Sequence, residues 1–190
     1  MLVSKIVSGG QTGVDRGAIA AARELGFPYG GMIPKGRLAE DGIVPEEFDQ
    51  MEVAPRKDYR FRTEWNVAHS DATLIISNYN TTPGSDRETL TGGTLRTERF
   101  CFTHGKPHLV IFTQNLDRVL GWLRSLGRSD LVLNVAGPRE SKSPGIQAKA
   151  HAFVSRLIES IRGESAAAGV AALEAPPPCA LRMCRVGNLK

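Results

Sequence analysis

The sequence predicts an α/β fold with a doubly wound, mostly parallel sheet and helices on both of its faces. Two observations support this prediction. Short apolar, β-rich runs alternate along the chain with amphipathic stretches of helical period. In addition, three glycine-rich loops each follow such an apolar run, at residues 8–17, 91–97 and 136–145. The 190 residues, of which 41% are hydrophobic, suffice for one domain with a substantial core.

The first half of the chain contains the first glycine loop and the first helix. Apolar residues at helical spacing predict a helix that Gly26 can end, and the run Ala-Thr-Leu-Ile-Ile-Ser predicts a buried parallel strand. The expected elements are a strand over 2–8, a helix over 15–25, a short strand over 27–33, a mostly irregular segment over 35–55 with a strand near 50–53, a helix over 59–70 and a strand over 72–77.

The second half continues the alternation after a polar loop over 78–92. We expect a helix over 93–104 that Gly105 ends, a strand over 108–113, a helix over 115–126, a strand over 131–135 and a final helix. Ser143 can cap this last helix, Pro144 suits its first turn, and Gly163 is expected to end it. Its apolar stripe comprises Ile146, Ala150, Phe153, Val154, Leu157, Ile158 and Ile161. Residues 1–162 are therefore expected to form the ligand-binding domain, and the Ala- and Pro-rich residues 163–190 a poorly ordered tail.

The glycine loops predict a ligand site. Loops at the carboxyl ends of parallel strands gather along one edge of the sheet, where ligands bind. Glycine allows close approach of a ligand, and free N–H groups at a helix start favour an anion. Three such loops indicate a phosphate-bearing or oxyanionic ligand. The alternatives are a tight strand-to-helix turn at the first loop, an ordinary Thr N-cap at the second and a solvated loop with outward-pointing charges at the third. The candidate binding residues are Gly9, Gly10, Gln11, Thr12, Gly13, Asp15, Arg16, Lys35, Arg37, Thr91, Gly92, Gly93, Thr94, Thr97, Gly137, Pro138, Arg139, Ser141 and Lys142.

Each loop contributes different groups. In the first, Gln11 and Thr12 can hydrogen-bond a ligand, Asp15 can cap the following helix and Arg16 can face an anion. The loop lacks the Gly-Lys-Ser/Thr ending of a P-loop and the GxGxxG pattern, which disfavours a nucleoside triphosphatase and an ordinary dinucleotide dehydrogenase. In the third loop, Arg139 and Lys142 can neutralise phosphate. Lys35 and Arg37 lie in another polar loop that can reach the same edge.

Catalytic groups are less evident than binding groups. Glu64, at the start of a predicted helix, and Glu140, in the third loop, are candidates for a general base, although Glu64 could equally favour its own helix dipole. Cys101 and His104 share a helix face but are more typical of packing than of metal binding. The four histidines form no recognisable metal motif, so no protein-ligated metal is expected.

Charge, cysteine content and hydropathy limit the partners and the cellular location that we expect for this protein. A net charge of +4 without a Lys/Arg run does not indicate nucleic-acid binding. Three cysteines without CxxC spacing predict a reduced, cytoplasmic protein without disulfides. The N-terminus has no signal-peptide pattern, and no apolar stretch has a length of roughly 18 residues, so no membrane association is expected.

Five stretches together resemble the molybdenum carrier (molybdenum cofactor carrier-like) family, which belongs to a Rossmann-like superfamily that includes the lysine-decarboxylase-like nucleotide phosphoribohydrolases. The resemblance extends over roughly residues 3–162 and does not include the tail. The stretches are residues 9–18, 34–42 (Pro34-Lys35-Gly36-Arg37 with Glu40-Asp41-Gly42), 62–67 (Arg-Thr-Glu-Trp-Asn-Val), 91–94 (Thr-Gly-Gly-Thr) and 134–141 (Asn-Val-Ala-Gly-Pro-Arg-Glu-Ser).

This resemblance implies a Rossmann-like fold, a homo-oligomer, and a molybdenum cofactor or nucleotide-like phosphate ligand, with a molybdoenzyme as a possible acceptor. The related phosphoribohydrolases carry Gly-Thr-x-x-Glu, whose Glu helps to cleave an N-glycosidic bond. Here Thr97 occupies the position of that Glu and Glu98 follows one place later, a rotation of about 100° on a helix. A carrier is therefore the first hypothesis. A nucleotide N-glycosidic hydrolase using Glu64 or Glu140, and a nucleotide-sensing module, are the alternatives.

Overall fold

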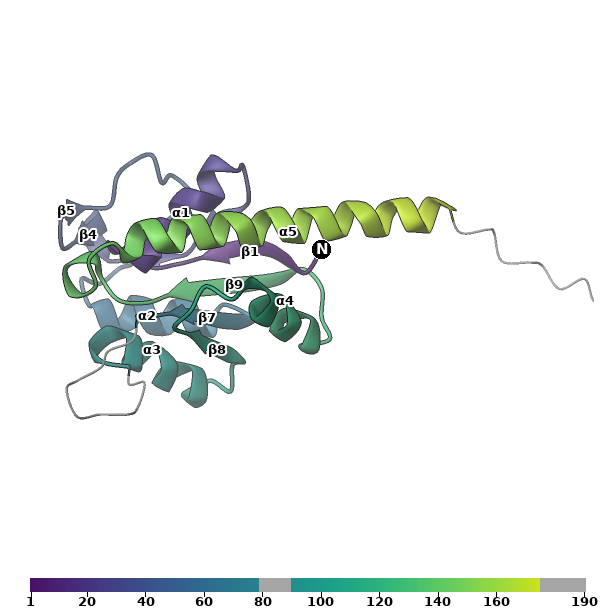
Figure 1. Ribbon diagram of the computed structural model, residues 1–190. Coiled ribbons are helices and arrows are strands. Elements are labelled where there is room, and N and C mark those ends of the chain that lie inside the picture. Colours follow the sequence, from purple (N-terminus) through teal and green to yellow (C-terminus); the bar gives the residue numbers. More distant parts are fainter. Residues whose placement is uncertain (79–89, 175–190) are drawn as a thin grey trace, which may run out of the picture.

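The computed structural model describes residues 1–78 and 90–174, with side chains described as far as residue 165. Its centre is a five-stranded sheet in the order β2-β1-β9-β7-β8, in which every neighbouring pair is parallel. The strands are β1 (Val3–Val7), β2 (Tyr29–Gly30), β7 (Ala72–Ile76), β8 (His108–Ile111) and β9 (Leu131–Ala136). The predicted fold class, a Rossmann-like α/β sheet, is confirmed (Figure 1).

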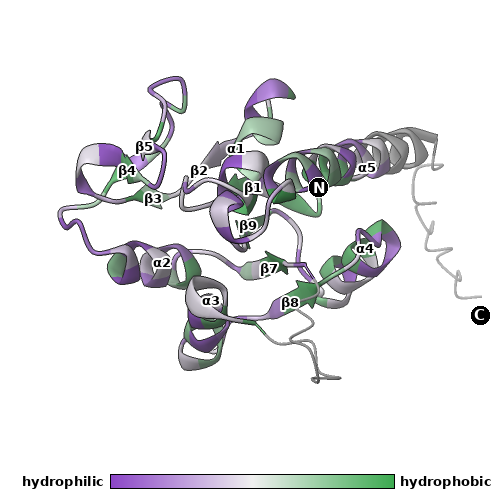
Figure 2. Cartoon of the chain, turned by 60° about the vertical axis from the view of Figure 1, so that its left-hand side comes forward, coloured by the Kyte–Doolittle hydropathy of each residue, from purple (hydrophilic) through white to green (hydrophobic). Residues whose placement is uncertain are grey.

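Helices cover both faces of this sheet, as the alternation of strands and helices predicts. Figure 2 shows α1, α4 and α5 on one face and α2 and α3 on the other. Their bounds are α1 Val14–Glu24, α2 Tyr59–Ala68, α3 Gly92–Thr103, α4 Leu116–Ser125 and α5 Ile146–Glu174. The expected helices and strands agree with these bounds within two residues, apart from the end of α5 and the division of 27–33 into two short strands.

The core lies between the sheet and helices α1 and α5. All seven residues of the expected stripe on α5, from Ile146 to Ile161, are buried there together with Ile6 and Leu133, which pair in register on adjacent strands. Burying an aliphatic side chain of this size stabilises the fold by about 1.5–3 kcal/mol relative to leaving it exposed. The stripe therefore attaches α5 firmly to the sheet.

The start of α5 differs from the expectation. The hydroxyl of Ser143 accepts a hydrogen bond from Asn78 rather than capping the helix. The carboxylate of Glu140, in the 3₁₀ turn η2 (Glu140–Lys142), instead accepts from the backbone N–H groups of Gly145 and Gln147. The helix start is thus stabilised by an acid that lies before it in the chain.

The end of α5 also differs, because the helix continues through Gly163 to Glu174 and projects beyond the sheet in Figure 1. The expected helix end at Gly163 is therefore wrong. One glycine costs a helix only about 1 kcal/mol relative to alanine, and the alanine-rich sequence that follows it favours the helix. The remainder of the expected tail, residues 175–190, and most of the expected loop over 78–92 lie outside the described residues.

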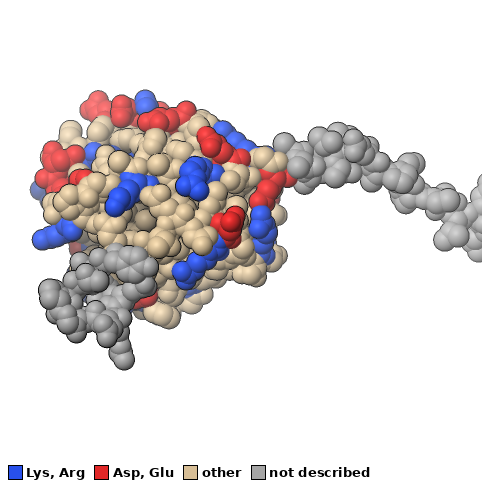
Figure 3. All heavy atoms as spheres, viewed as in Figure 1, with Lys and Arg blue, Asp and Glu red and all other residues tan. Residues whose placement is uncertain are grey.

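Residues 32–53 form short elements at the β2 edge of the sheet. Strands β3 (Met32–Ile33) and β6 (Glu52–Val53) pair in parallel, and β4 (Leu38–Ala39) and β5 (Gly42–Ile43) form a small antiparallel hairpin after the 3₁₀ turn η1 (Lys35–Arg37). The hairpin was not predicted, because strands of two residues are too short to show periodicity. On the face seen in Figure 3, basic and acidic side chains are interspersed. None of the described helices is long and apolar enough to span a bilayer.

Candidate ligand-binding pocket

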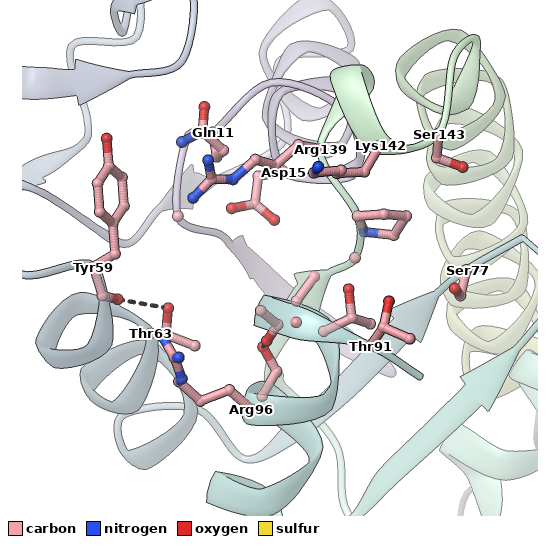
Figure 4. A pocket seen from close by; sticks show the side chains of 18 of the residues that line it. Gln11, Asp15, Tyr59, Thr63, Ser77, Thr91, Arg96, Arg139, Lys142 and Ser143 are labelled. Carbon is pink, nitrogen blue, oxygen red and sulfur yellow. Dashed lines mark hydrogen bonds between the residues drawn. The ribbon is translucent and has the colours of Figure 1, made fainter. Parts of the chain in front are cut away.

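A pocket of about 440 Å³ lies at the carboxyl edge of the central sheet (Figure 4). The loops that follow β1 and β9 form one side of it, and the starts of α2 and α3 form the other. The edge is the one on which the glycine-rich loops were expected to meet. Its predicted residues are Gly9, Gln11, Asp15, Thr91, Gly92, Gly93, Thr94, Thr97, Gly137, Pro138, Arg139 and Lys142. Residues from all three glycine-rich loops thus line a single pocket.

Gly13 explains how the first and third loops approach one another. Its φ of +81° is in the left-handed region, and a Cβ at this position would lie 2.3 Å from the carbonyl oxygen of Pro138. The next residue, Val14, donates its N–H to that same oxygen at 3.2 Å. Gly13 itself lies outside the pocket, as does Gly10, so both shape the loop rather than line the cavity.

Thr12 and Ser141 bind a protein carboxylate. Both line a neighbouring hollow, which we call the Glu40 recess (Thr12, Glu40, Asp41, Glu140, Ser141 and Gln147). Thr12 Oγ1 donates to Glu40, and Ser141 Oγ donates to the other Glu40 oxygen at 2.6 Å. Burial disfavours the charged form of Glu40, but the hydrogen bonds from Ser141 and Thr12 outweigh it and lower its pKa. Glu40 therefore joins the first and third loops.

Three predicted cations lie outside the pocket. Arg16 donates from Nε to the carbonyl of Gly10 at 3.1 Å, and its two terminal nitrogens bind the carboxylate of Asp41 at 3.2 and 3.3 Å. Arg37 donates to three carbonyl oxygens of its own loop, which belong to Val44, Pro45 and Phe48. Lys35 is exposed and does not line the pocket either. The positive charge of the pocket comes from other residues.

Neither candidate catalytic glutamate lines the pocket. Glu64 lies on the surface, with its Oε1 3.1 Å from Nε2 of His104. The carboxylate of Glu140 accepts a hydrogen bond from the backbone N–H of Gln147 at the start of α5. Glu98, the displaced acid of the second loop, has an oxygen 4.0 Å from Nε2 of His108. Among the described residues, the acidic side chain that lines the pocket is that of Asp15.

Asp15 forms a buried ion pair with Arg62. Nη1 of Arg62 lies 2.9 Å from Oδ2 of Asp15, and the two side chains are only 11% and 7% exposed respectively. Burial raises the pKa of Asp15 above its usual value, although the charge and hydrogen bond of Arg62 oppose the change. Asp15 does not cap α1 as expected, since Gly13 holds the N-cap position and no side chain caps it.

Sequence reasoning missed the contribution of helix α2. Asp58 caps this helix by accepting from the N–H of Arg60 at 2.8 Å, and one face of the helix then lines the pocket. That face consists of Tyr59, Arg62, Thr63 and Asn66. Their spacing of three and four residues is a polar helical face, which is the signal that could have revealed them. The other missed lining residues are Ser77, Asn78, Arg96, Asn134, Ala136 and Ser143.

The electrostatics of the pocket favour an anion. Among the described residues, four basic side chains line it, those of Arg62, Arg96, Arg139 and Lys142, against the one carboxylate of Asp15. The start of α3 adds the positive end of a helix dipole. Within residues 1–78 and 90–174, no three His, Cys, Asp or Glu side chains gather as metal ligands.

The fold places the chain in the class of Rossmann-like α/β proteins. Residues 6–158 match the model of the circularly permutated YpsA SLOG family, and the chain belongs to this family. A crystal structure from Syntrophus aciditrophicus SB, described as a "putative molybdenum carrier protein", is 42% identical. That alignment covers 82% of this chain and 94% of the other, with a TM-score of 0.68. A search of curated proteins found no match.

Proposed function

We propose that this chain is a molybdenum cofactor carrier that holds a phosphorylated pterin, or a nucleotide-like ligand with the same phosphate, in the pocket at the carboxyl edge of the sheet. The observation that carries the proposal is the convergence of a glycine-rich helix start with four basic side chains on one cavity. Family membership and the description of the Syntrophus protein support the choice of a carrier.

The phosphate is assigned to the start of α3. Gly92 and Gly93 open this helix of 12 residues, so their N–H groups have no partner within the helix and can donate to an oxyanion. A Cβ built at either glycine would meet no described atom within 4 Å, so no described residue obstructs a ligand beside this backbone. Gly92 also has a φ of +56°, which disfavours any larger residue at this position.

The side chains around this helix start complement a phosphate. Arg96 lies one turn along α3 and Lys142 comes from the opposite loop, and both line the pocket. Arg139 lies over the ring of Tyr59, with Cζ 5.3 Å from the ring centroid, and pairs only distantly with Glu40 at 4.0 Å. Its exposed guanidinium is therefore available to a ligand, and the Tyr59 ring offers an apolar face beside it.

The size of the pocket suits a small molecule with a ring and a phosphate. Its volume of about 440 Å³ falls within the range of roughly 300–1,000 Å³ that is typical of ligand and cofactor sites. In this proposal any molybdenum is cargo that the pterin holds, and the protein binds the organic part. A molybdoenzyme is then the natural acceptor of the cargo.

Binding without turnover accounts for the placement of the acids better than hydrolysis does. A glycosidic hydrolase needs a carboxyl group within hydrogen-bond reach of the reacting atoms. Among the described residues, Glu64 and Glu140 lie outside the pocket, and Oδ2 of Asp15 pairs with Nη1 of Arg62 at 2.9 Å. A carrier needs no such group.

Native mass spectrometry of the purified chain, followed by identification of the small molecules that denaturation releases, tests the proposal. We expect a pterin or nucleotide that bears phosphate, one per chain, and we expect it to be released unchanged. The Arg96→Met/Lys142→Met variant should purify without it, whereas the same charge change at exposed Arg118 and Arg156 should retain it. Recovery of a free base with ribose phosphate would favour the hydrolase, and a phosphate-free ligand would contradict the proposed site.

A further inference from the structure

The side-chain amide of Gln11 has a fixed orientation. Its Oε1 accepts hydrogen bonds from two backbone N–H groups, those of Thr12 at 3.0 Å and Glu40 at 2.8 Å. An amide turned the other way would place its NH₂ group against two donors, so this network determines which atom is nitrogen. The Nε2 atom is therefore a hydrogen-bond donor whose direction is set by the first loop and by Glu40.

This donor has no acceptor within the described parts of the protein. Gln11 lines the pocket and is only 4% exposed, and its Nε2 is buried without a hydrogen-bond partner among the described residues. A buried donor without an acceptor costs about 1–3 kcal/mol, because it loses its bonds to water and gains nothing in return. Such a group in a ligand pocket is typical of one that a ligand satisfies.

The other amides of the pocket show that Gln11 is different. Asn66 donates to the carbonyl of Met32 at 3.0 Å, Asn134 donates to Thr73 Oγ1 at 3.3 Å, and Asn78 donates to Ser143 Oγ. Each of these three amides is engaged by the protein and serves to hold loops and strands together. Gln11 is the amide lining the pocket whose nitrogen remains without a described acceptor.

We infer that Gln11 Nε2 donates to a carbonyl oxygen on the ring of the ligand, so that the pocket selects an oxo-substituted over an amino-substituted heterocycle. This inference rests on the proposed function, in which the phosphate occupies the start of α3. In Figure 4, Gln11 and Tyr59 lie across the pocket from Thr91 and Ser77, so a ring can reach Gln11 while its phosphate reaches α3. The class includes pterins and 6-oxopurines.

Arg62 strengthens this selectivity. Its Nε also lacks a partner among the described residues, so a second donor borders the pocket beside Gly9. The carboxylate of Asp15, which could accept from a ring amino group, already accepts from Arg62 Nη1 at 2.9 Å. Beside Gln11 Nε2 and Arg62 Nε, an amino group on the ring would therefore face two donors, whereas a carbonyl oxygen there could accept hydrogen bonds from them. Unpaired polar groups of this kind give large discrimination between substituents.

Titration calorimetry of the full chain with three compounds tests the inference. Ribose 5-phosphate carries the phosphate alone, whereas inosine and adenosine monophosphates add rings that bear an oxo or an amino group at the same position. We expect all three to bind, with inosine monophosphate about tenfold tighter than adenosine monophosphate, since one satisfied donor is worth about 1.4 kcal/mol. Equal affinities for the two nucleotides would overturn the inference while leaving the phosphate site intact. Failure of ribose 5-phosphate and of both nucleotides to bind would overturn the proposed function and the inference with it.

The Gln11→Glu variant replaces the hydrogen-bond donor Nε2 by an acceptor oxygen. The retained Oε1 still accepts from Thr12 and Glu40, but the donor becomes an acceptor, so the preference should move toward adenosine monophosphate by tenfold or more. Gln114→Glu makes the same charge change at an exposed residue and should keep the preference for the oxo ring. An unchanged preference in Gln11→Glu would overturn the inference. If this variant does not fold, the affinities of the native chain for inosine and adenosine monophosphates still test the inference.

Discussion

The guanidinium of Arg62 occupies the space that a side chain at residue 9 would need. A Cβ built on Gly9 would lie 1.2 Å from Nη1 and 2.2 Å from Cζ of Arg62. The absence of a side chain at Gly9 thus lets an arginine from α2 reach across the first loop to Asp15 on α1, where they form the buried pair at 2.9 Å. This close approach connects a glycine of the first loop to the charge distribution of the pocket.

Gly9→Ala should therefore expel Arg62 and leave Asp15 buried without its partner. We expect the free energy of unfolding to fall by roughly 1–3 kcal/mol, because a buried charged group loses its hydrogen bond. Urea-induced unfolding followed by circular dichroism measures the loss. Gly121→Ala in α4 is the matched control, since a Cβ there meets nothing within 4 Å and alanine favours a helix by about 0.5–1 kcal/mol. A Gly9→Ala protein as stable as the native chain would contradict this role of Arg62.

Asp15 should give the stability of the protein a pH dependence of defined sign. Burial raises its pKa in the folded state from an ordinary value of 3.8, so between these two pKa values the folded state binds a proton that the unfolded state releases. The contribution of this carboxyl to stability is then fully present below the ordinary pKa and is lost as the pH rises through the folded pKa.

Comparing native and Asp15→Asn proteins by urea unfolding across pH 3–8 isolates this effect, since asparagine does not titrate. The free energy of unfolding of the native protein should decrease relative to that of Asp15→Asn as the pH rises above the ordinary range near 4. The difference should become constant above the folded pKa. If the native protein instead gained stability over Asp15→Asn with rising pH, the prediction would be contradicted. The charge of Arg62 would then affect the pKa of Asp15 more than burial does.

Glu140 should act on stability, because its carboxylate accepts from Gln147 N–H at 2.9 Å and also from Gly145 N–H at the start of α5. Glu140→Ala is expected to lower the free energy of unfolding by about 1 kcal/mol, as the loss of a helix cap does. The same substitution at Glu64, whose partner is the surface residue His104, should change stability by less. Thermal unfolding of the two variants measures which one loses more stability. A larger loss in Glu64→Ala than in Glu140→Ala would contradict this role of Glu140.

Much of the fold could be predicted because its strands and helices are long enough to show periodicity. The stripe from Ile146 to Ile161 on α5 is an example, since its spacing alone identifies the buried face. The hairpin of β4 and β5 could not be predicted, because two residues on each side give no pattern. The continuation of α5 through Gly163 could not be predicted either. The cost of one glycine in a helix and the helix propensity of the alanine-rich residues that follow it are similar in size, so a sequence pattern does not show which one prevails.

The pocket could be predicted in part for a related reason. Glycine loops at strand ends have a known place in an α/β sheet, so residues such as Gly92 and Arg139 were placed on the correct edge. Which arginine faces the pocket is a tertiary property. Arg16 belongs to the first loop, yet it binds Asp41, whereas Arg62 comes from helix α2 and binds Asp15. The polar face of α2 marks Arg62 as a candidate, but only the tertiary structure shows that Arg62 lines the pocket and that Arg16 does not.

The central claim is that the start of α3 and its neighbouring cations bind phosphate, and calorimetry with ribose 5-phosphate at low ionic strength tests it most directly. The native chain should bind one molecule per chain. Arg96→Met/Lys142→Met should weaken binding about a hundredfold, since each charge-assisted hydrogen bond is worth roughly tenfold or more. The charge-matched control Arg118→Met/Arg156→Met should bind like the native chain. No saturable binding to the native chain, or an equal loss in both double variants, would contradict the account.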